Sequence, residues 1–152
     1  MPVELSLKVD AQRLVSVWKN TGSTPVALAF WWNRRLRVRD ASGAVVEPGP
    51  GPVLPCGVAE DWTVIEPGQS FERDEALACT QPAGRSEPIG WSYDHLAAGP
   101  WKVTLLFAAP PAHGFSQSPP HPHAFTGSLE SNEVTWVVPT RPKSLMDRLL
   151  GR

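Results

Sequence analysis

Histidines are the residues of this chain whose spacing comes closest to a chemical site. His113, His121 and His123 lie in one segment, P-P-A-H-G-F-S-Q-S-P-P-H-P-H-A-F, and an H-x-H pair binds a metal when both rings face the same way. A metal site normally needs three or four ligands held by further hydrogen bonds, and no Cys, Asp or Glu lies between Pro110 and Leu129. The sequence therefore predicts no physiological metal site in this segment.

Nucleophilic catalysis would need a Ser or Cys activated by a His and a carboxylate. No G-x-S-x-G motif occurs, and Ser92, with His95 close by, lies in a segment that we interpret as a crossover between sheets. The run G-P-G-P at 49–52 has prolines where a phosphate-binding loop needs backbone N–H donors. We therefore expect a protein that is not an enzyme, with a small hydrolase as the weakest alternative.

Aromatic and arginine side chains offer a binding surface instead. The chain has seven tryptophans, and four of them lie outside the core positions of the expected strands: Trp31, Trp32, Trp62 and Trp91. These side chains either cover the core and the loop bases, or form a platform for a sugar, or contact a protein, since Trp and Arg are frequent hot spots. Trp31 with Arg35 and Arg37 is the best cluster for a protein partner.

The proline-rich loop 110–125 is a second candidate for recognition. Proline lowers the entropy that a loop loses on binding, so Phe115 and Phe125 could act as anchors beside His121 and His123. The alternative is a loop that is merely mobile. The predicted partner-binding residues are therefore Trp31, Arg35, Arg37, Phe115, His121, His123 and Phe125.

The stretch 98–108 predicts the strand around which the domain is organised. Large apolar residues occupy every second position of it: Trp101, Val103, Leu105 and Phe107. An extended chain places all four on one face, with Lys102 and Thr104 on the other. The apolar face needs a second sheet above it, which indicates two packed antiparallel sheets.

The first third of the chain predicts further strands. Residues 3–9 alternate with Val3, Leu5, Leu7 and Val9 on the core side, and 12–20 are expected to bury Leu14 and Trp18. The turn residues of 20–25 predict a hairpin-like reversal. The stretch 26–32 is apolar on both faces and therefore central in its sheet. The stretch 35–39, in contrast, presents Arg35, Arg37 and Arg39 on a solvated or edge face.

The rest of the chain continues the pattern. We expect a short strand at 62–65, a type II turn at 66–69 and a polar edge strand at 70–77. One helical turn at 93–96 should cross between sheets, and a last strand covers about 127–138, with Val134, Trp136 and Val138 in the core. Residues 141–152 have apolar residues at helical spacing and predict a short helix, packed on the sandwich or on a partner.

Composition limits the classes of partner. The 152 residues suit one domain at 1–139 with a tail at 140–152, and a net charge of −1 argues against binding nucleic acid or anionic lipid. No stretch approaches the roughly 18 apolar residues of a membrane span, and no export signal is recognisable, so we expect a cytoplasmic protein unless such a signal has been removed. Cys56 and Cys79 could form a disulfide, although a reducing cytosol would keep them as thiols.

Five segments together resemble the bacterial immunoglobulin-like β-sandwich modules that include the intracellular proteinase-inhibitor family. They are W-K-N-T-G-S-T-P-V-A-L-A-F (18–30), L-R-V-R-D-A-S-G-A-V-V (36–46), I-E-P-G-Q-S-F (65–71), L-A-A-G-P-W-K-V-T-L (96–105) and S-N-E-V-T-W-V-V (131–138). The resemblance implies an all-β, immunoglobulin-like antiparallel sandwich of seven to eight strands, with no cofactor, that acts by binding a protein. Inhibition of a protease is an extension of this likeness, and a carbohydrate-binding sandwich is the alternative.

Overall fold

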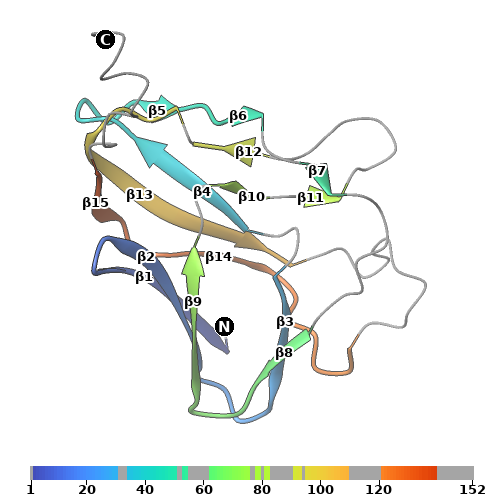
Figure 1. Ribbon diagram of the computed structural model, residues 1–152. Helices are drawn as coiled ribbons and strands as arrows, with labels where there is room; N and C mark the ends of the chain where they lie inside the picture. Colours follow the sequence, from blue (N-terminus) through green and yellow to red (C-terminus); the bar gives the residue numbers. More distant parts are fainter. Residues whose placement is uncertain are drawn as a thin grey trace, which may run out of the picture.

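The protein is all-β in a computed structural model that describes residues 2–30, 34–50, 53–54, 62–75, 78–79, 81–82, 91–93, 95–109 and 121–139. Figure 1 shows the strands in order along the chain. They are β1 (Val3–Asp10), β2 (Arg13–Asn20), β3 (Val26–Ala29), β4 (Arg34–Arg39), β5 (Val45–Val46), β6 (Gly49–Pro50), β7 (Val53–Leu54), β8 (Trp62–Ile65), β9 (Ser70–Glu75), β10 (Ala78–Cys79), β11 (Gln81–Pro82), β12 (Trp91–Ser92), β13 (Gly99–Ala108), β14 (Ser128–Glu130) and β15 (Val134–Val138). No helix occurs in these residues, and none of them could therefore cross a membrane as a helix.

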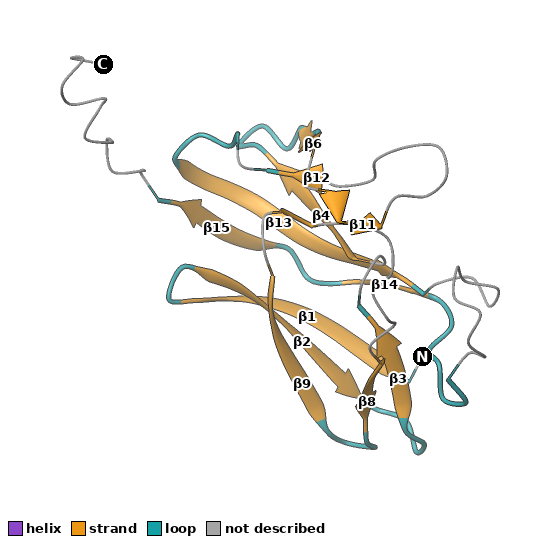
Figure 2. Ribbon diagram, turned by 45° about the vertical axis from the view of Figure 1, so that its right-hand side comes forward, coloured by secondary structure: helices purple, strands orange, loops and turns teal. Residues whose placement is uncertain are grey.

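Two antiparallel sheets form the main layers. One has the order β1-β2-β9, and the other has the order β14-β13-β4-β5, with β15 also paired to β13. Figure 2 shows the two layers lying one above the other, with β3 and β8 beside the first. The predicted organising strand, β13, is paired along both edges. Its ten residues therefore hold the second layer together, as the alternation of 98–108 predicts.

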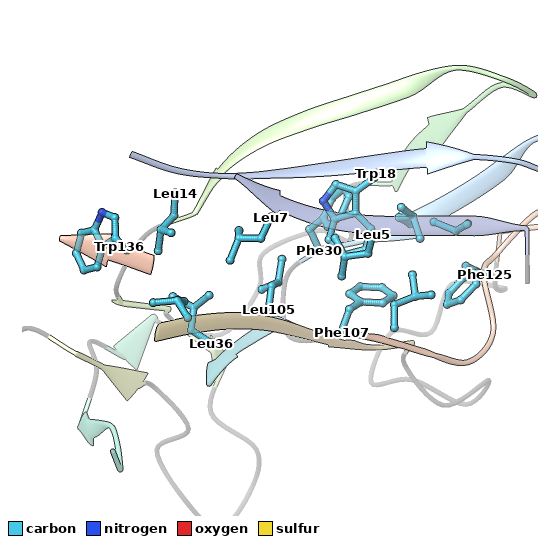
Figure 3. Packing of buried hydrophobic residues seen from close by; sticks show 14 of the residues in the cluster. Leu5, Leu7, Leu14, Trp18, Phe30, Leu36, Leu105, Phe107, Phe125 and Trp136 are labelled. Atoms are coloured by element: carbon cyan, nitrogen blue, oxygen red, sulfur yellow. The ribbon is translucent and has the colours of Figure 1, made fainter. Parts of the chain in front are cut away.

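The core lies between these layers. The faces predicted to be apolar supply it: Leu5, Leu7, Leu14 and Trp18 from one sheet, and Leu36, Val38, Val103, Leu105 and Phe107 from the other. Trp18 is fully buried, and its ring meets the rings of Phe30 and Phe107 edge-on, each at 5.0 Å between centroids. Such pairs contribute about 1 kcal/mol each beyond the area that they bury. Figure 3 shows Trp18 at the centre of this cluster.

The hairpin-like reversal predicted at 20–25 does not form a paired hairpin, because β2 and β3 do not pair with each other. β2 pairs with β9, and β3 pairs with β8, so both pairs turn the same corner together. Asn20 fills this corner with no exposed surface: its Nδ2 donates to the carbonyls of Thr24 (2.8 Å) and Ile65 (2.9 Å), and its Oδ1 accepts from the N–H of Gly22 (2.9 Å). The buried amide of Asn20 thus has hydrogen-bond partners for both its nitrogen and its oxygen, and these bonds fix the shape of the corner.

The predicted type II turn at 66–69 is confirmed. Gly68 has φ +76°, which this turn requires at its third position, and the N–H of Gln69 donates to the carbonyl of Glu66 at 3.0 Å. The predicted edge strand after it is β9, which pairs with β2 alone in the described part of the chain. The turn 93–96 is a single turn in which the N–H of Leu96 donates to the carbonyl of Tyr93 at 3.1 Å.

The predicted last strand is divided in two. β14 and β15 both pair with β13, and the three residues 131–133 lie opposite two residues of β13, which is a β-bulge. The bulge is held by Ser131, whose Oγ accepts the N–H of Leu105 (2.9 Å) and whose N–H donates to the carbonyl of Leu105 (3.0 Å). Val138 is half-buried and Trp136 is buried, as predicted for the core side.

Two further predictions differ in detail. Val9 is 41% exposed although it shares the phase of the buried residues of β1, because it lies next to the turn at the end of the strand. Val15 is 4% exposed although it faces outward, because Lys8 and Asp74 flank it in the neighbouring strands. The tail helix at 141–152 and a Cys56–Cys79 disulfide lie outside the described residues.

Candidate functional site

The arginine row of β4 lies where the alternation predicts. Leu36 and Val38 are buried, and Arg35 and Arg37 face outward. β4 lies between β13 and β5, but β5 pairs only with Val38 and Arg39. In the described residues, the side of β4 at Arg35 and Arg37 therefore has no strand partner other than β13. The charges of the row are compensated: Arg37 pairs with Glu130 at 2.8 Å and Arg35 with Glu47 at 3.8 Å. Trp31, the third member of the predicted cluster, lies outside the described residues.

The predicted histidines lie on a short segment that is attached to β3. The N–H of Ala27 donates to the carbonyl of His123 (2.8 Å), and the N–H of Phe125 donates to the carbonyl of Ala27 (2.9 Å). β3 is therefore flanked by β8 on one edge and by this segment on the other, in agreement with its predicted central place. A turn closed by the N–H of Ala124 on the carbonyl of His121 (2.9 Å) then directs the chain back over the sheet.

Phe125 fixes this segment to the core. Its side chain is 7% exposed and its ring lies 6.1 Å from that of Phe107. Figure 3 shows Phe125 at the same end of the cluster as Phe107. The side chain of Phe125 therefore points into the core and is not the exposed anchor that the sequence predicts. Its neighbour Ala124 pairs with Ala27 of β3, so the Phe125 side chain lies on the opposite, core side. Phe115, the other predicted anchor, lies outside the described residues.

His121 meets Trp62 across β3, and this contact forms the candidate site. Trp62 is opposite Ala29 in the pairing of β8 with β3, and its ring lies 5.6 Å from that of His121. The two residues come from opposite edges of β3, so their rings lie over its outer face, where β3 has only Ala27 and Ala29. These alanines are small enough to leave room for the contact, and both are buried beneath it.

We call this patch the Trp62–His121 surface and define it by Trp62, Val64, His121 and His123. Trp62 and His121 are half-buried, Val64 is 43% exposed, and His123 is exposed. The rings of His121 and His123 lie 5.9 Å apart, and the N–H of His123 donates to Nδ1 of His121 at 3.2 Å. The surface is therefore largely aromatic, and none of its four residues is an Asp, Glu, Lys or Arg.

The sequence singles out Trp62, His121 and His123, but it does not predict the contact between Trp62 and His121. Trp62 was one of four tryptophans with no assigned face, and Val64 had no predicted role. The alanines at 27 and 29 were the available signal, because small residues on the outer face of a central strand leave space for larger neighbours. In the described residues no three potential metal ligands gather, around His121 and His123 or elsewhere.

The segment around Ser92 is built differently. Ser92 is buried in β12 opposite Gly49, whereas His95 is exposed. Between them, Tyr93 is buried and its hydroxyl donates to the carbonyl of Leu36 at 3.0 Å. Burial raises the pKa of Tyr93, so the phenol stays protonated above its ordinary range.

Comparisons with protein-family models, with curated proteins and with solved structures find no match for this chain. The site must therefore be interpreted from its own residues.

Proposed function

We propose that the protein is a cytoplasmic, non-enzymatic protein-binding module with an immunoglobulin-like sandwich, and that its Trp62–His121 surface contacts the partner. The observation that supports this best is the contact of the two rings across β3. It places a half-buried tryptophan and a histidine on one outward face, together with an exposed valine. Tryptophans in such positions are frequent hot spots of protein interfaces.

The rigidity of the patch favours binding. Trp62 lies in a paired strand, and the segment of His121 and His123 is hydrogen-bonded to β3 and anchored by Phe125. Side chains held in this way lose little conformational entropy when a partner docks, so more of the contact energy contributes to affinity. The arginine row stays a second predicted surface, although its ion pairs leave less charge for a partner.

A carbohydrate-binding module is the alternative. The half-buried ring of Trp62 beside His121 favours it, because a ring fixed on a sheet offers a flat apolar surface with a hydrogen-bonding group next to it. Inhibition of a protease is a more specific form of the protein-binding proposal, which the resemblance to the intracellular proteinase-inhibitor family suggests.

Affinity capture with surface variants tests the proposal. We expect Trp62→Ala and Val64→Asp to weaken capture of a partner by about tenfold or more, as hot-spot substitutions do. Val137→Asp is the matched control, because Val137 is also an exposed strand valine, on β15. Arg37→Glu tests the arginine row in the same assay. A partner that binds wild type and Trp62→Ala equally would overturn the assignment of the surface.

A glycan titration distinguishes the carbohydrate-binding alternative from the protein-binding proposal. Because the chain has seven tryptophans, the change in fluorescence of wild type is compared with that of Trp62→Phe. A saturable change that is lost in the variant would support carbohydrate binding and contradict the protein-binding proposal. Addition of the protein to a panel of proteases, with residual activity as the readout, tests inhibition.

A further inference from the structure

The outer edge of β9 has backbone groups directed away from its sheet. In an antiparallel pair, each residue directs both its N–H and its C=O either toward the partner strand or away from it, in alternation. The backbone of Asn20 bonds to the β9 side, through the carbonyl of Gln69 and the N–H of Gly68. The carbonyl of Arg73 is directed toward β2, where it accepts the Oγ of Ser16. The register of β2 with β9 therefore directs Phe71, Arg73 and Glu75 toward β2, and Ser70, Glu72 and Asp74 outward. No strand of the described ranges pairs with this edge.

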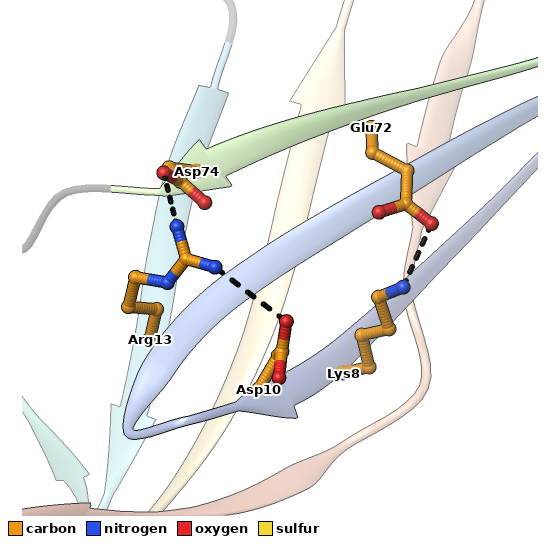
Figure 4. A network of polar contacts seen from close by, with 5 residues as sticks. All are labelled: Lys8, Asp10, Arg13, Glu72 and Asp74. Atoms are coloured by element: carbon orange, nitrogen blue, oxygen red, sulfur yellow. Dashed lines mark hydrogen bonds and ion pairs between the residues drawn. The ribbon is translucent and has the colours of Figure 1, made fainter.

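The carboxylates of β9 do not protect this edge. Charged side chains often block an edge strand by extending over it. Here Glu72 bonds to Lys8 of β1 at 2.7 Å, and Asp74 bonds to Arg13 of β2 at 3.0 Å. Both carboxylates are therefore drawn back over the face of the sheet, as Figure 4 shows. The backbone of the edge remains accessible beside them.

The other long edge strand of this sheet is blocked. The side chain of Asn132 occupies the outward backbone groups of Leu7: its Oδ1 accepts the N–H (2.8 Å) and its Nδ2 donates to the carbonyl (3.0 Å). In the second sheet, the outer strand is interrupted by the bulge at 131–133, and β5 has two residues. Among these strands of the two main sheets, only β9 combines six regular residues with a free edge.

We propose that β9 accepts an extended segment of a partner protein as an additional strand, and that this segment alternates apolar with basic residues. Strand addition satisfies the outward N–H and C=O groups of Glu72 and Asp74. The added apolar side chains would cover Phe71, which is half-buried and stacks on Phe30 at 5.5 Å on the core side. The basic side chains would lie on the outer face, which carries one more carboxylate than cation: Glu4, Asp10, Glu72 and Asp74 against Lys8, Arg13 and Lys19.

Amide hydrogen exchange read by NMR tests this proposal with a short synthetic peptide of alternating lysine and valine. In the free protein we expect rapid exchange at Glu72 and Asp74 and slow exchange at Phe71 and Arg73. The peptide should slow exchange at Glu72 and Asp74. The same peptide N-methylated throughout should have no effect, and one with glutamate in place of lysine should bind more weakly.

Two variants of Glu72 distinguish the contribution of the backbone N–H to peptide binding from that of the carboxylate charge. Glu72→Pro removes an outward N–H that β2 does not use. It should weaken binding of the peptide by about tenfold or more, because the edge loses a donor and the proline ring obstructs the added strand. Glu72→Ala removes the charge but keeps the N–H, and should weaken binding of the peptide less than Glu72→Pro does. Trp62→Ala should bind the peptide as wild type does, so this proposal can fail without the proposed function failing.

Three results would overturn the proposal. Slow exchange at Glu72 and Asp74 in the free protein at every concentration would mean that the chain itself covers the edge. Protection that grows with protein concentration alone would identify a second copy as the occupant. Unchanged exchange on addition of the lysine–valine peptide would show that the edge does not take a basic strand.

Discussion

The side chain of Asn132 forms both hydrogen bonds of a β-ladder with the backbone of Leu7. Asn132 belongs to the bulge between β14 and β15, and Leu7 lies in β1, so one amide joins the edges of the two main sheets. A second bond joins them nearby, from Nε1 of Trp136 to the carbonyl of Gln12 at 2.8 Å. This side of the domain is therefore closed by side chains instead of by a strand.

Replacement of Asn132 should open this side. Asn132→Ala leaves the partly buried N–H and C=O of Leu7 without their protein partner, and we expect a loss of about 1–3 kcal/mol in the free energy of unfolding. Urea denaturation measures the loss, and faster exchange of the Leu7 amide locates it. Glu133→Ala is the control, because it removes a surface ion pair with Lys102 worth at most about 1 kcal/mol. Equal losses in the two variants would contradict the account.

Replacement of Asn20 should disrupt the shared corner of β2–β3 and β8–β9. Asn20→Ala leaves the carbonyl of Ile65 without a donor in a buried place and that of Thr24 without one in a partly buried place, which should cost about 3 kcal/mol. Thermal and urea unfolding measure it. Thr21→Ala is the comparison, because Thr21 is exposed and should change stability by no more than about 0.5 kcal/mol. A neutral Asn20→Ala would show that the corner forms without this residue.

The ion pair between Arg34 and Glu75 should be worth far more than the surface pairs. Both side chains are largely buried, and Glu75 also accepts a bond from Oγ of Ser16 at 2.6 Å. Glu75→Gln leaves a buried guanidinium without its counter-charge, at a cost of about 3–5 kcal/mol, whereas Glu72→Gln at the surface should cost at most about 1 kcal/mol. Urea denaturation compares the two. The double replacement of Arg34 by Met and Glu75 by Leu should recover most of the loss, and failure to do so would indicate that the pair positions β4.

Tyr93 should make the protein sensitive to high pH. Burial raises its pKa above the ordinary value of 10.0, so the folded state holds the phenol proton after the unfolded state has released it. Stability is therefore constant below pH 10 on this account and falls as the pH rises above it.

Because Tyr93 is the only tyrosine, absorbance at the phenolate band follows its ionisation alone. We expect a midpoint above 10 in the native protein. Tyr93→Phe should lose the alkaline dependence of stability, together with the bond to Leu36. A native midpoint at or below 10 would contradict the effect of burial.

Much of the strand pattern was predictable, because alternation of side chains is a local property. The buried faces of β1, β2, β4 and β13 follow from the residues at every second position, and the turn at 66–69 follows from Pro67 and Gly68. The predicted reversal at 20–25 does not pair its two strands as a hairpin, because turn residues reverse a chain without specifying which strands then pair. The single last strand was wrong because the bulge depends on Leu105, a residue of another strand.

The site was less predictable for the same reason. His121 and His123 were singled out correctly as neighbours. The small residues Ala27 and Ala29 indicated room over β3, but they did not identify Trp62 as the neighbour of His121. Phe125 was expected outside and lies in the core, since its face is set by the attachment of its segment to Ala27. Arg35 and Arg37 face outward as expected, while their ion pairs with Glu47 and Glu130 come from distant strands.

The amino-acid sequence by itself determined that the chain forms strands, which of their faces are buried and where a turn with positive φ occurs, because these depend on neighbouring residues and on backbone sterics. Only the tertiary structure decided which strands pair, which edges stay open and which side chains meet across β3. Those outcomes depend on the packing and hydrogen bonding of residues that are remote along the chain, and no local pattern encodes them.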